Sequence, residues 1–203
     1  MALRLITAPS VEPLTLAETK QHLRVDATDD DTMIASYIAA ARSYCDGQYS
    51  WLGRALVTQT WELVIDAFPI SEIVIPLPPL QSVISVKYDD SGGVEQTVDP
   101  ANYFVDNVSE PGWVVPIASF TWPSTLNAIN AVRIRYIAGY PPDTSSPPDL
   151  RFNIPPTIKQ GMLLIIGNLY ENREDNLAGT TINAMPFGTE NLLRPHRVRL
   201  GMA

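Results

Sequence analysis

The sequence predicts an α+β protein: a small helical bundle with about three main helices plus a short C-terminal one, a large antiparallel β-rich insertion, and an extended C-terminal tail. Apolar residues recur with helical spacing near both ends, whereas the block between them alternates with a period of two. The flanking helices are too few to fold apart, so this block is interpreted as an insertion into one helical domain. The expected parts are an N-terminal arm and helical pair (1–54), the β-rich insertion (55–140), a proline-rich linker (141–156), a core helix with a short C-terminal helix completing the helical domain (157–193), and an extended basic tail (194–203).

The strongest helical pattern runs from Pro155 to Arg173. Its two leading prolines suit a helix start, because the first turn does not use the N–H groups that proline lacks. Gly161 and Gly167 each cost about 1 kcal/mol relative to alanine inside a helix. They either allow another backbone to approach closely or are merely tolerated. A helix this apolar must be buried on most sides, and its apolar positions include Ile158, Met162, Ile165, Ile166, Leu169 and Tyr170.

Residues 1–13 are expected to form an extended arm, followed by two helices. Thr15 and Glu18 have the spacing of a capping box, in which each side chain bonds the backbone N–H of the other. Asp29, Asp30 and Asp31 open the second helix, since acidic residues complement the positive end of a helix dipole. The buried stripe of the second helix is predicted to be Ile34, Tyr37, Ile38, Ala41 and Cys45.

The acidic residues before the second helix also allow a calcium interpretation. Asp26, Thr28 and Asp30 alternate like the oxygen ligands of a calcium-binding loop. However, Asp31 stands where that loop needs a turn glycine, and Tyr37 stands where it needs a bidentate glutamate. The helix start is therefore favoured over a calcium site.

The block from 55 to 140 predicts about six or seven strands, rich in β-branched and aromatic residues. Asp90, Gly92 and Gly93 lie in a hairpin turn, where glycine adopts a positive φ at little cost. The following linker, 141–156, contains six prolines and few apolar residues, so it is expected to be stiff and exposed.

Composition limits the class of protein. The formal net charge of −8 argues against a protein that mainly grips nucleic-acid phosphates, but not against DNA passing by without being held. The single cysteine, Cys45, excludes an intramolecular disulfide and a cysteine metal cage. No run reaches the ~18 apolar residues that span a membrane, and no signal peptide is recognised. We expect a protein kept in a cytoplasm or built into a particle assembled there.

Residues able to support catalysis are few and scattered. His22 and His196 have no second histidine or cysteine at a metal-ligand spacing. Cys45 lies on the apolar stripe of a helix, where a small hydrophobic residue fits. The sequence contains neither a glycine-rich phosphate loop opening a helix nor a nucleophile elbow. The prediction is that the protein is not an enzyme and has no catalytic, cofactor-binding or metal-binding residues.

The order of segments resembles the head–tail connector (adaptor, or head-completion) proteins of tailed bacteriophages and related gene transfer agents. The resemblance covers nearly the whole chain, from Pro13 to Val198. The segments that carry it are PLTLAETKQHLRVD, DDDTMIASYIAAARSYCDG, RALVTQTWELVIDAFP, PPLQSVISVKYDDSGGVEQTVDPANYFVD, VRIRYIAGY, IPPTIKQGMLLIIGNLYENRED and PFGTENLLRPHRV.

The resemblance implies a structural protein of the virion neck, assembled in the host bacterial cytoplasm. Such proteins form a ring, typically of twelve copies, beneath the portal vertex. They extend the DNA channel, through which DNA passes without specific binding, and carry the stopper or tail. The implied partners are therefore the portal protein, a stopper or tail-terminator protein and further copies of the chain, without a membrane.

Two sets of residues are predicted to serve these contacts. The basic tail is expected to be extended, because Pro195 would stop a helix, and to bind the portal with Leu192, Leu193, Arg194, His196, Arg197, Val198, Arg199 and Leu200. The core helix is expected near the seam between ring subunits, with Ile158, Met162, Ile165, Ile166, Leu169 and Tyr170.

Two alternatives stay open. One is another neck component, such as a stopper or tail-completion protein, although those tend to be smaller and more wholly β. The other is a ligand-binding module, for example for carbohydrate, or an enzyme that uses clefts of the β block.

Overall fold

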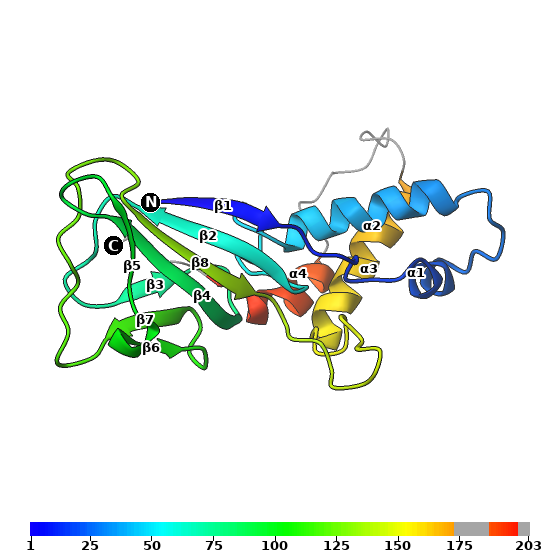
Figure 1. Cartoon of the computed structure of the whole chain (residues 1–203). Coiled ribbons are helices and arrows are strands. Elements are labelled where there is room, and N and C mark those ends of the chain that lie inside the picture. The colour runs from blue at the N-terminus through cyan, green and yellow to red at the C-terminus, as the bar shows by residue number, and fades with distance from the viewer. Residues whose placement is uncertain (173–186, 199–203) are drawn as a thin grey trace.

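The computed structural model describes residues 1–172 and 187–198. Its helices are α1 (Leu16–Leu23), α2 (Asp31–Cys45), α3 (Pro156–Glu171) and α4 (Phe187–Leu193), with short 3-10 helices η1 (Pro100–Asn102) and η2 (Arg194–His196). Its strands are β1 (Ala2–Thr7), β2 (Gln59–Ile65), β3 (Ile73–Ile75), β4 (Leu80–Asp89), β5 (Glu95–Thr97), β6 (Tyr103–Asp106), β7 (Gly112–Pro116) and β8 (Val132–Ala138). The strands gather at one end of the molecule and the helices at the other (Figure 1). The predicted α+β class is confirmed.

Two antiparallel sheets make up the β region. The larger has the strand order β1-β2-β8-β4-β5, and the smaller has the order β3-β7-β6. Strand β2 is an interior strand that pairs with β1 on one edge and β8 on the other, and most of its residues are buried. The predicted hairpin joins β4 to β5, and Gly93 in its turn has a φ of +80°.

The N-terminal arm is part of the larger sheet. Residues 2–7 form the edge strand β1, which pairs with β2 so that Leu3 lies opposite Leu63. The sequence predicted an extended conformation here but gave no sign of this pairing. The partner strand lies more than fifty residues away, and periodicity describes only local structure.

Each region has its own hydrophobic core. The β core lies between the two sheets and includes the fully buried Ile134, Tyr136 and Val114. The helical core is built from both ends of the chain, because it joins Leu14 and Ile38 to Leu193. The helical region therefore closes only when the C-terminal segment is in place.

Local signals explain where the first helices begin. Thr15 and Glu18 form the predicted capping box, with both reciprocal hydrogen bonds present. The second helix begins after Asp30, and Ile34, Ile38, Ala41 and Cys45 are its buried residues. Tyr37, predicted for the same stripe, is only partly buried. These helices place the C-terminal end of α2 against the start of the larger sheet, as Figure 1 shows.

The described part of the C-terminal tail differs from the sequence prediction. Arg194–His196 form η2 instead of an extended chain. Pro195 stands in the first turn of this short helix, where its missing N–H is not needed. Arg199 and Leu200, also assigned to the tail, lie outside the described residues.

Candidate docking interface of the C-terminal segment

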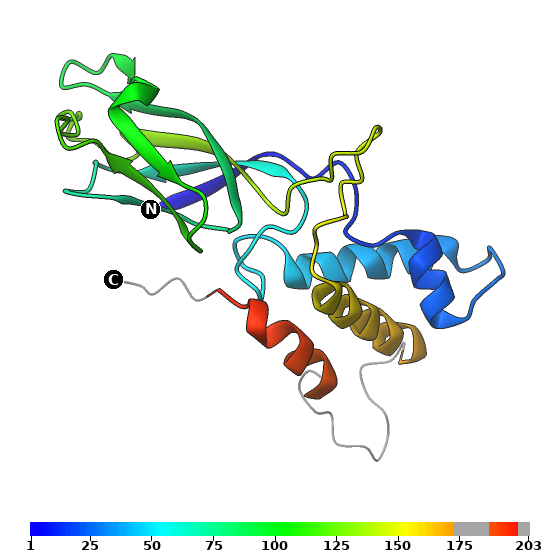
Figure 2. The same ribbon diagram turned by 90° about the horizontal axis from the view of Figure 1, so that it is seen from below.

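Residues 187–198, here called the C-terminal segment, pack against the chain's own helical core. Helix α4 lies beside α3 (Figure 2). Leu193 at its end is 0% exposed. A Cβ atom added to Gly161 would come within 2.6 Å of Leu193 Cδ2. Gly161 therefore permits the close approach of α4, whereas a Cβ at Gly167 would make only ordinary contact at 3.6 Å with His22 Nε2.

Past α4, the segment runs along residues 51–54. The backbone N–H of Val198 donates to the Leu52 carbonyl at 2.8 Å. The Arg197 guanidinium lies 4.6 Å from the centre of the Trp51 ring, a cation–π contact. Gly53 has a φ of +66°, and a Cβ there would lie 2.7 Å from the Val198 carbonyl oxygen. Glycine is therefore required at this position for both its backbone conformation and the space.

Arg54 ties this arrangement to the β region. It is 4% exposed, and its Nε donates to the His196 carbonyl at 2.7 Å. Its terminal nitrogens donate to Glu110 Oε2 at 2.8 Å, to Glu110 Oε1 at 3.3 Å and to Tyr140 Oη at 2.7 Å. Burial raises the pKa of Tyr140, which keeps its hydroxyl protonated. Three segments far apart in the sequence therefore meet on one guanidinium.

His196 is held on both its backbone and its ring. Its carbonyl accepts from Arg54, and its Nε2 shares a hydrogen bond of 2.7 Å with Thr157 Oγ1 on α3. Burial, together with the positive charge of Arg54, holds the pKa of His196 below its usual value. The ring is therefore uncharged at neutral pH and links the C-terminal segment to the first turn of α3.

The structure separates the predicted portal-binding residues into three groups. Leu193 is buried in the chain's own core, where it offers no surface to a partner. Leu192, His196 and Val198 are partly exposed. Arg194 and Arg197 are exposed, although Arg197 stacks on Trp51.

The predicted residues of α3 are either buried or partly exposed. Ile158, Met162 and Ile166 are 0% exposed and fill the helical core. Ile165 is partly exposed and packs at the edge of that core. Leu169 and Tyr170 are also partly exposed, and the Tyr170 hydroxyl donates to Asp30 Oδ2 at 2.6 Å. The part of α3 that faces outward and is apolar is therefore smaller than the sequence alone suggests.

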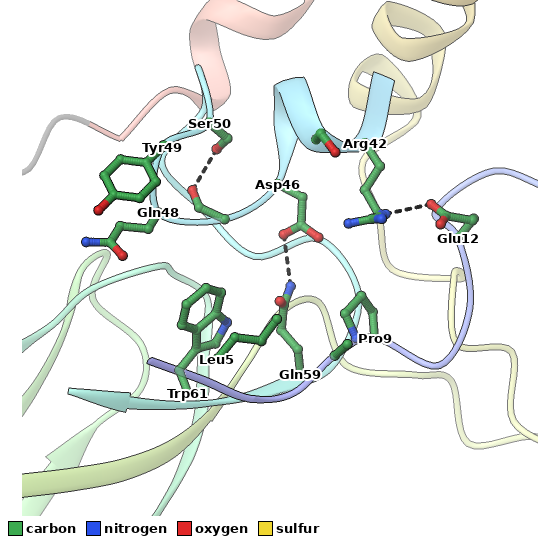
Figure 3. A pocket seen from close by; sticks show the side chains of 13 residues that line it. Leu5, Pro9, Glu12, Arg42, Asp46, Gln48, Tyr49, Ser50, Gln59 and Trp61 are labelled. Atoms are coloured by element: carbon green, nitrogen blue, oxygen red, sulfur yellow. Dashed lines mark hydrogen bonds and ion pairs between the residues drawn. The ribbon is translucent and has the colours of Figure 1, made fainter. Parts of the chain in front are cut away.

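A cavity of about 490 Å³ lies where the helical and β regions meet (Figure 3). Asp46, which follows α2, reaches into the junction, where its Oδ1 accepts from the Leu56 N–H and from Gln59 Nε2. Burial raises the pKa of Asp46 to about 6. Glu12 in the same cavity is paired with Arg42 at 2.7 Å.

These contacts give the cavity a structural role. Asp46 connects the end of one helix to the start of the larger sheet through its contacts with Leu56 and Gln59, and Glu12 is held by its ion pair with Arg42.

Two further candidates for chemistry are a thiolate at Cys45 and a metal site. Cys45 is buried, and burial raises the pKa of its thiol to about 12, so a thiolate nucleophile is disfavoured. Within residues 1–172 and 187–198, His, Cys, Asp and Glu side chains form no group of three that could hold a metal ion. No helix in the same part of the chain is long and apolar enough to cross a membrane.

Comparisons with known proteins give the class of protein. Residues 13–67 match the family model of phage gp6-like head–tail connector proteins. A comparison with curated protein sequences gives no match. Among solved structures, a chain from the neck of an empty gene transfer agent particle, computed with C6 symmetry, aligns with a TM-score of 0.77 and 25% identity. That alignment covers 100% of this chain and 99% of the other.

Two further structures share the fold over the same extents. One is from the virion of a native gene transfer agent particle, with a TM-score of 0.77 and 24% identity. The other is from the neck of a native particle computed with C12 symmetry, with a TM-score of 0.69 and 23% identity. Both alignments cover 100% of this chain and 99% of the other.

The resemblance predicted from the sequence is confirmed. Residues 13–67 match the head–tail connector family, and the whole chain has the fold of a chain from a gene transfer agent particle. The matching proteins are structural components of phage or particle necks.

Sequence reasoning did not identify Arg54, Glu110 or Tyr140 as part of a site. Their separations of 56 and 86 residues leave no periodic pattern. One usable signal was present, because Arg54 directly precedes the apolar residues Ala55–Val57 and is the one cation in that stretch of sequence before β2. A charged residue at such a position is expected to have a specific partner.

Proposed function

We propose that this protein is a structural adaptor of a virion neck, placed between the portal vertex and the tail or stopper. The observation that carries the proposal is the alignment over the whole chain with a neck chain of a gene transfer agent particle. The match of residues 13–67 to the connector family supports it independently from sequence. The structural alignment is informative because it covers both the helical and the β region. Similarity of the N-terminal helical pair alone would be compatible with many kinds of assembly.

In this proposal the protein forms a ring, of twelve copies, that is coaxial with the portal. Support comes from α3, whose Leu164 and Leu169 are partly exposed apolar side chains beside the exposed Asn168. Neither leucine belongs to the set that packs on the helical core. A neighbouring subunit would remove the rest of both side chains from water, which is favourable by roughly 25 cal/mol per Å² of apolar surface buried.

The C-terminal segment is the proposed contact with the portal. Its exposed Arg194 and the stacked Arg197 are cations in a protein of net charge −8. Together with Arg199, they would pair with portal carboxylates through charge-assisted hydrogen bonds, and Leu200 would add an apolar contact. Leu193 does not take part in this contact, because its side chain is buried in the helical core.

The net charge of −8 also suits a channel protein. Binding to DNA gains free energy from counterions released when cations neutralise phosphates. A wall with few unpaired cations gains little in this way, so DNA slides past without being held.

The direct test is electron microscopy of the purified protein mixed with its portal. A ring of matching symmetry on the portal is expected, and particles lacking the protein should have full heads without tails. A monomeric protein that leaves the portal bare under all conditions would refute the proposal.

The ring seam has its own test. Leu169→Asp should abolish ring formation while the thermal midpoint of the monomer changes little, because Leu169 lies outside the helical core. Ile129→Asp is the matched control, since Ile129 is 80% exposed on a loop far from α3 in the sequence. Equal ring formation by both variants would show that the contact between ring subunits does not involve this face of α3.

A further inference from the structure

Arg54 is the one buried cation among residues 1–172 and 187–198. A buried guanidinium needs an acceptor for its N–H groups, because an unpaired charged donor costs more free energy than a neutral one. Here the acceptors are the Glu110 carboxylate, the Tyr140 hydroxyl and the His196 carbonyl. Two of the three belong to the β region and its exit, whereas the third belongs to the C-terminal segment.

The contact with the C-terminal segment is continuous along four residues. The Arg197 guanidinium stacks on the Trp51 ring, and the Leu52 carbonyl accepts a hydrogen bond from the Val198 N–H. Gly53 leaves room for the Val198 carbonyl. Arg54 follows directly and binds the carbonyl of His196. Side chain and backbone contacts therefore fix both the position and the direction of the last described residues.

We propose that Arg54 is the positioning residue of the C-terminal segment: it locks residues 196–198 to the β6–β7 loop, and so fixes the position of this segment on the body. Arg54 acts through the segment and does not itself touch the portal. This inference rests on the proposed function, because a fixed position of the segment matters only if the segment docks on a partner. In a ring, the lock makes every copy present its basic residues at the same height.

The geometry requires arginine at this position. The guanidinium sends Nε toward the His196 carbonyl while its two terminal nitrogens hold both oxygens of Glu110. A lysine carries the same charge but only one nitrogen, so it cannot make the bidentate contact and bind the carbonyl together. The Arg54→Lys variant therefore keeps the positive charge but loses the simultaneous contacts with Glu110 and the His196 carbonyl.

The experiment measures how readily the segment leaves its site. Trypsin cleaves after arginine unless proline follows, so the Arg197–Val198 bond is a reporter, whereas the Arg194–Pro195 bond resists. In the folded protein this bond is protected by the Val198 hydrogen bond and the Trp51 contact. Arg54→Lys should speed its cleavage about tenfold, the effect of losing one charged hydrogen bond.

Two controls separate positioning from unfolding. Cleavage at Arg42–Ser43, inside α2, reports global unfolding and should not accelerate. Arg135→Lys makes the same substitution at a surface arginine paired with Glu62, and it should leave the reporter bond unchanged. If Arg54→Lys fails to fold, Glu110→Gln replaces it, because the Glu110 side chain is 41% exposed and tolerates the change.

Attachment to portal-containing capsids completes the test. Arg54→Lys or Glu110→Gln should reduce attachment about tenfold while the protein stays folded, since a mobile tail must be ordered again on binding. If the unmodified protein does not attach, the proposed function is wrong. The cleavage assay by itself then still tests whether Arg54 holds residues 196–198 in place. Equal acceleration at both bonds, or no acceleration at either, would overturn the assignment of Arg54.

Discussion

The β region and the helical region are stabilised in different ways. The β region closes on itself, because its core lies between two sheets formed by residues 2–138. The helical region is assembled from the two ends of the chain, and Leu14 and Leu193 meet in one core. The proposed partner contacts therefore lie on the region whose core includes the C-terminal segment. Events at the C-terminal segment are coupled to the stability of the helical core through Leu193, whereas Leu193 is not part of the β core.

The largest expected effect comes from breaking the helical core. Ile166→Asp should destabilise the protein by more than about 4 kcal/mol, because it places an unpaired carboxylate in an apolar interior. Chemical denaturation followed by circular dichroism measures the loss. Lys159→Asp on the same helix is the control and should cost far less, since Lys159 is only partly buried. Equal losses would mean that α3 is not the centre of this core.

The charged outer face of the larger sheet offers the next test. Glu62 is 5% exposed and accepts from Arg135 at 2.8 Å, with Arg4 as a more distant partner at 3.5 Å. Arg135→Met should cost about 2 kcal/mol, because a buried carboxylate loses its main partner. Lys87→Met removes an exposed pair with Glu95 and should leave the denaturation midpoint unchanged. Similar effects of the two variants would show that burial of Glu62 does not matter.

Asp46 tests the junction between the regions. Its pKa is raised by burial from 3.8 to about 6, so the folded state binds a proton more tightly than the unfolded chain. The stabilising contribution is full below about pH 4 and is lost as the pH rises through 6. Asp46→Asn should therefore add about 1 to 2 kcal/mol at pH 7.5 and flatten the fall in stability between pH 5 and 7.

The measurement is the free energy of unfolding as a function of pH, with Asp26→Asn as the control at an exposed aspartate. An Asp46→Asn profile parallel to that of the unmodified protein would show that another group causes the pH dependence.

The smallest effects concern the two glycines of α3 and should differ in sign. Gly167→Ala should stabilise the protein by up to about 1 kcal/mol, because alanine favours a helix and the added methyl meets only an ordinary contact. Gly161→Ala should destabilise by about 1 kcal/mol, since its methyl would push Leu193 from its place. Thermal unfolding measures both. Combining Gly161→Ala with Leu193→Ala should remove the clash, and an additive double variant would argue against it.

Sequence analysis identified the features whose physical causes are local. Thr15 and Glu18 are three residues apart, so a capping box is visible in the sequence and was found in the structure. The same holds for α3 and for the hairpin around Gly93. The resemblance to connector proteins depended on the order of such local segments. The partner of β1 was missed, because Arg4 and Glu62 are 58 residues apart.

The sequence by itself determined the class of fold, the main helices and the lack of a recognisable catalytic motif, because these follow from periodicity, caps and composition. Only the tertiary structure decided which apolar residues of α3 belong to the subunit core. It also decided why Gly161 is a glycine, since the reason is a side chain of α4. Arg54 and the His196 carbonyl lie 142 residues apart and meet only when both ends of the chain fold together. Contacts of this kind depend on packing in three dimensions, which no local pattern encodes.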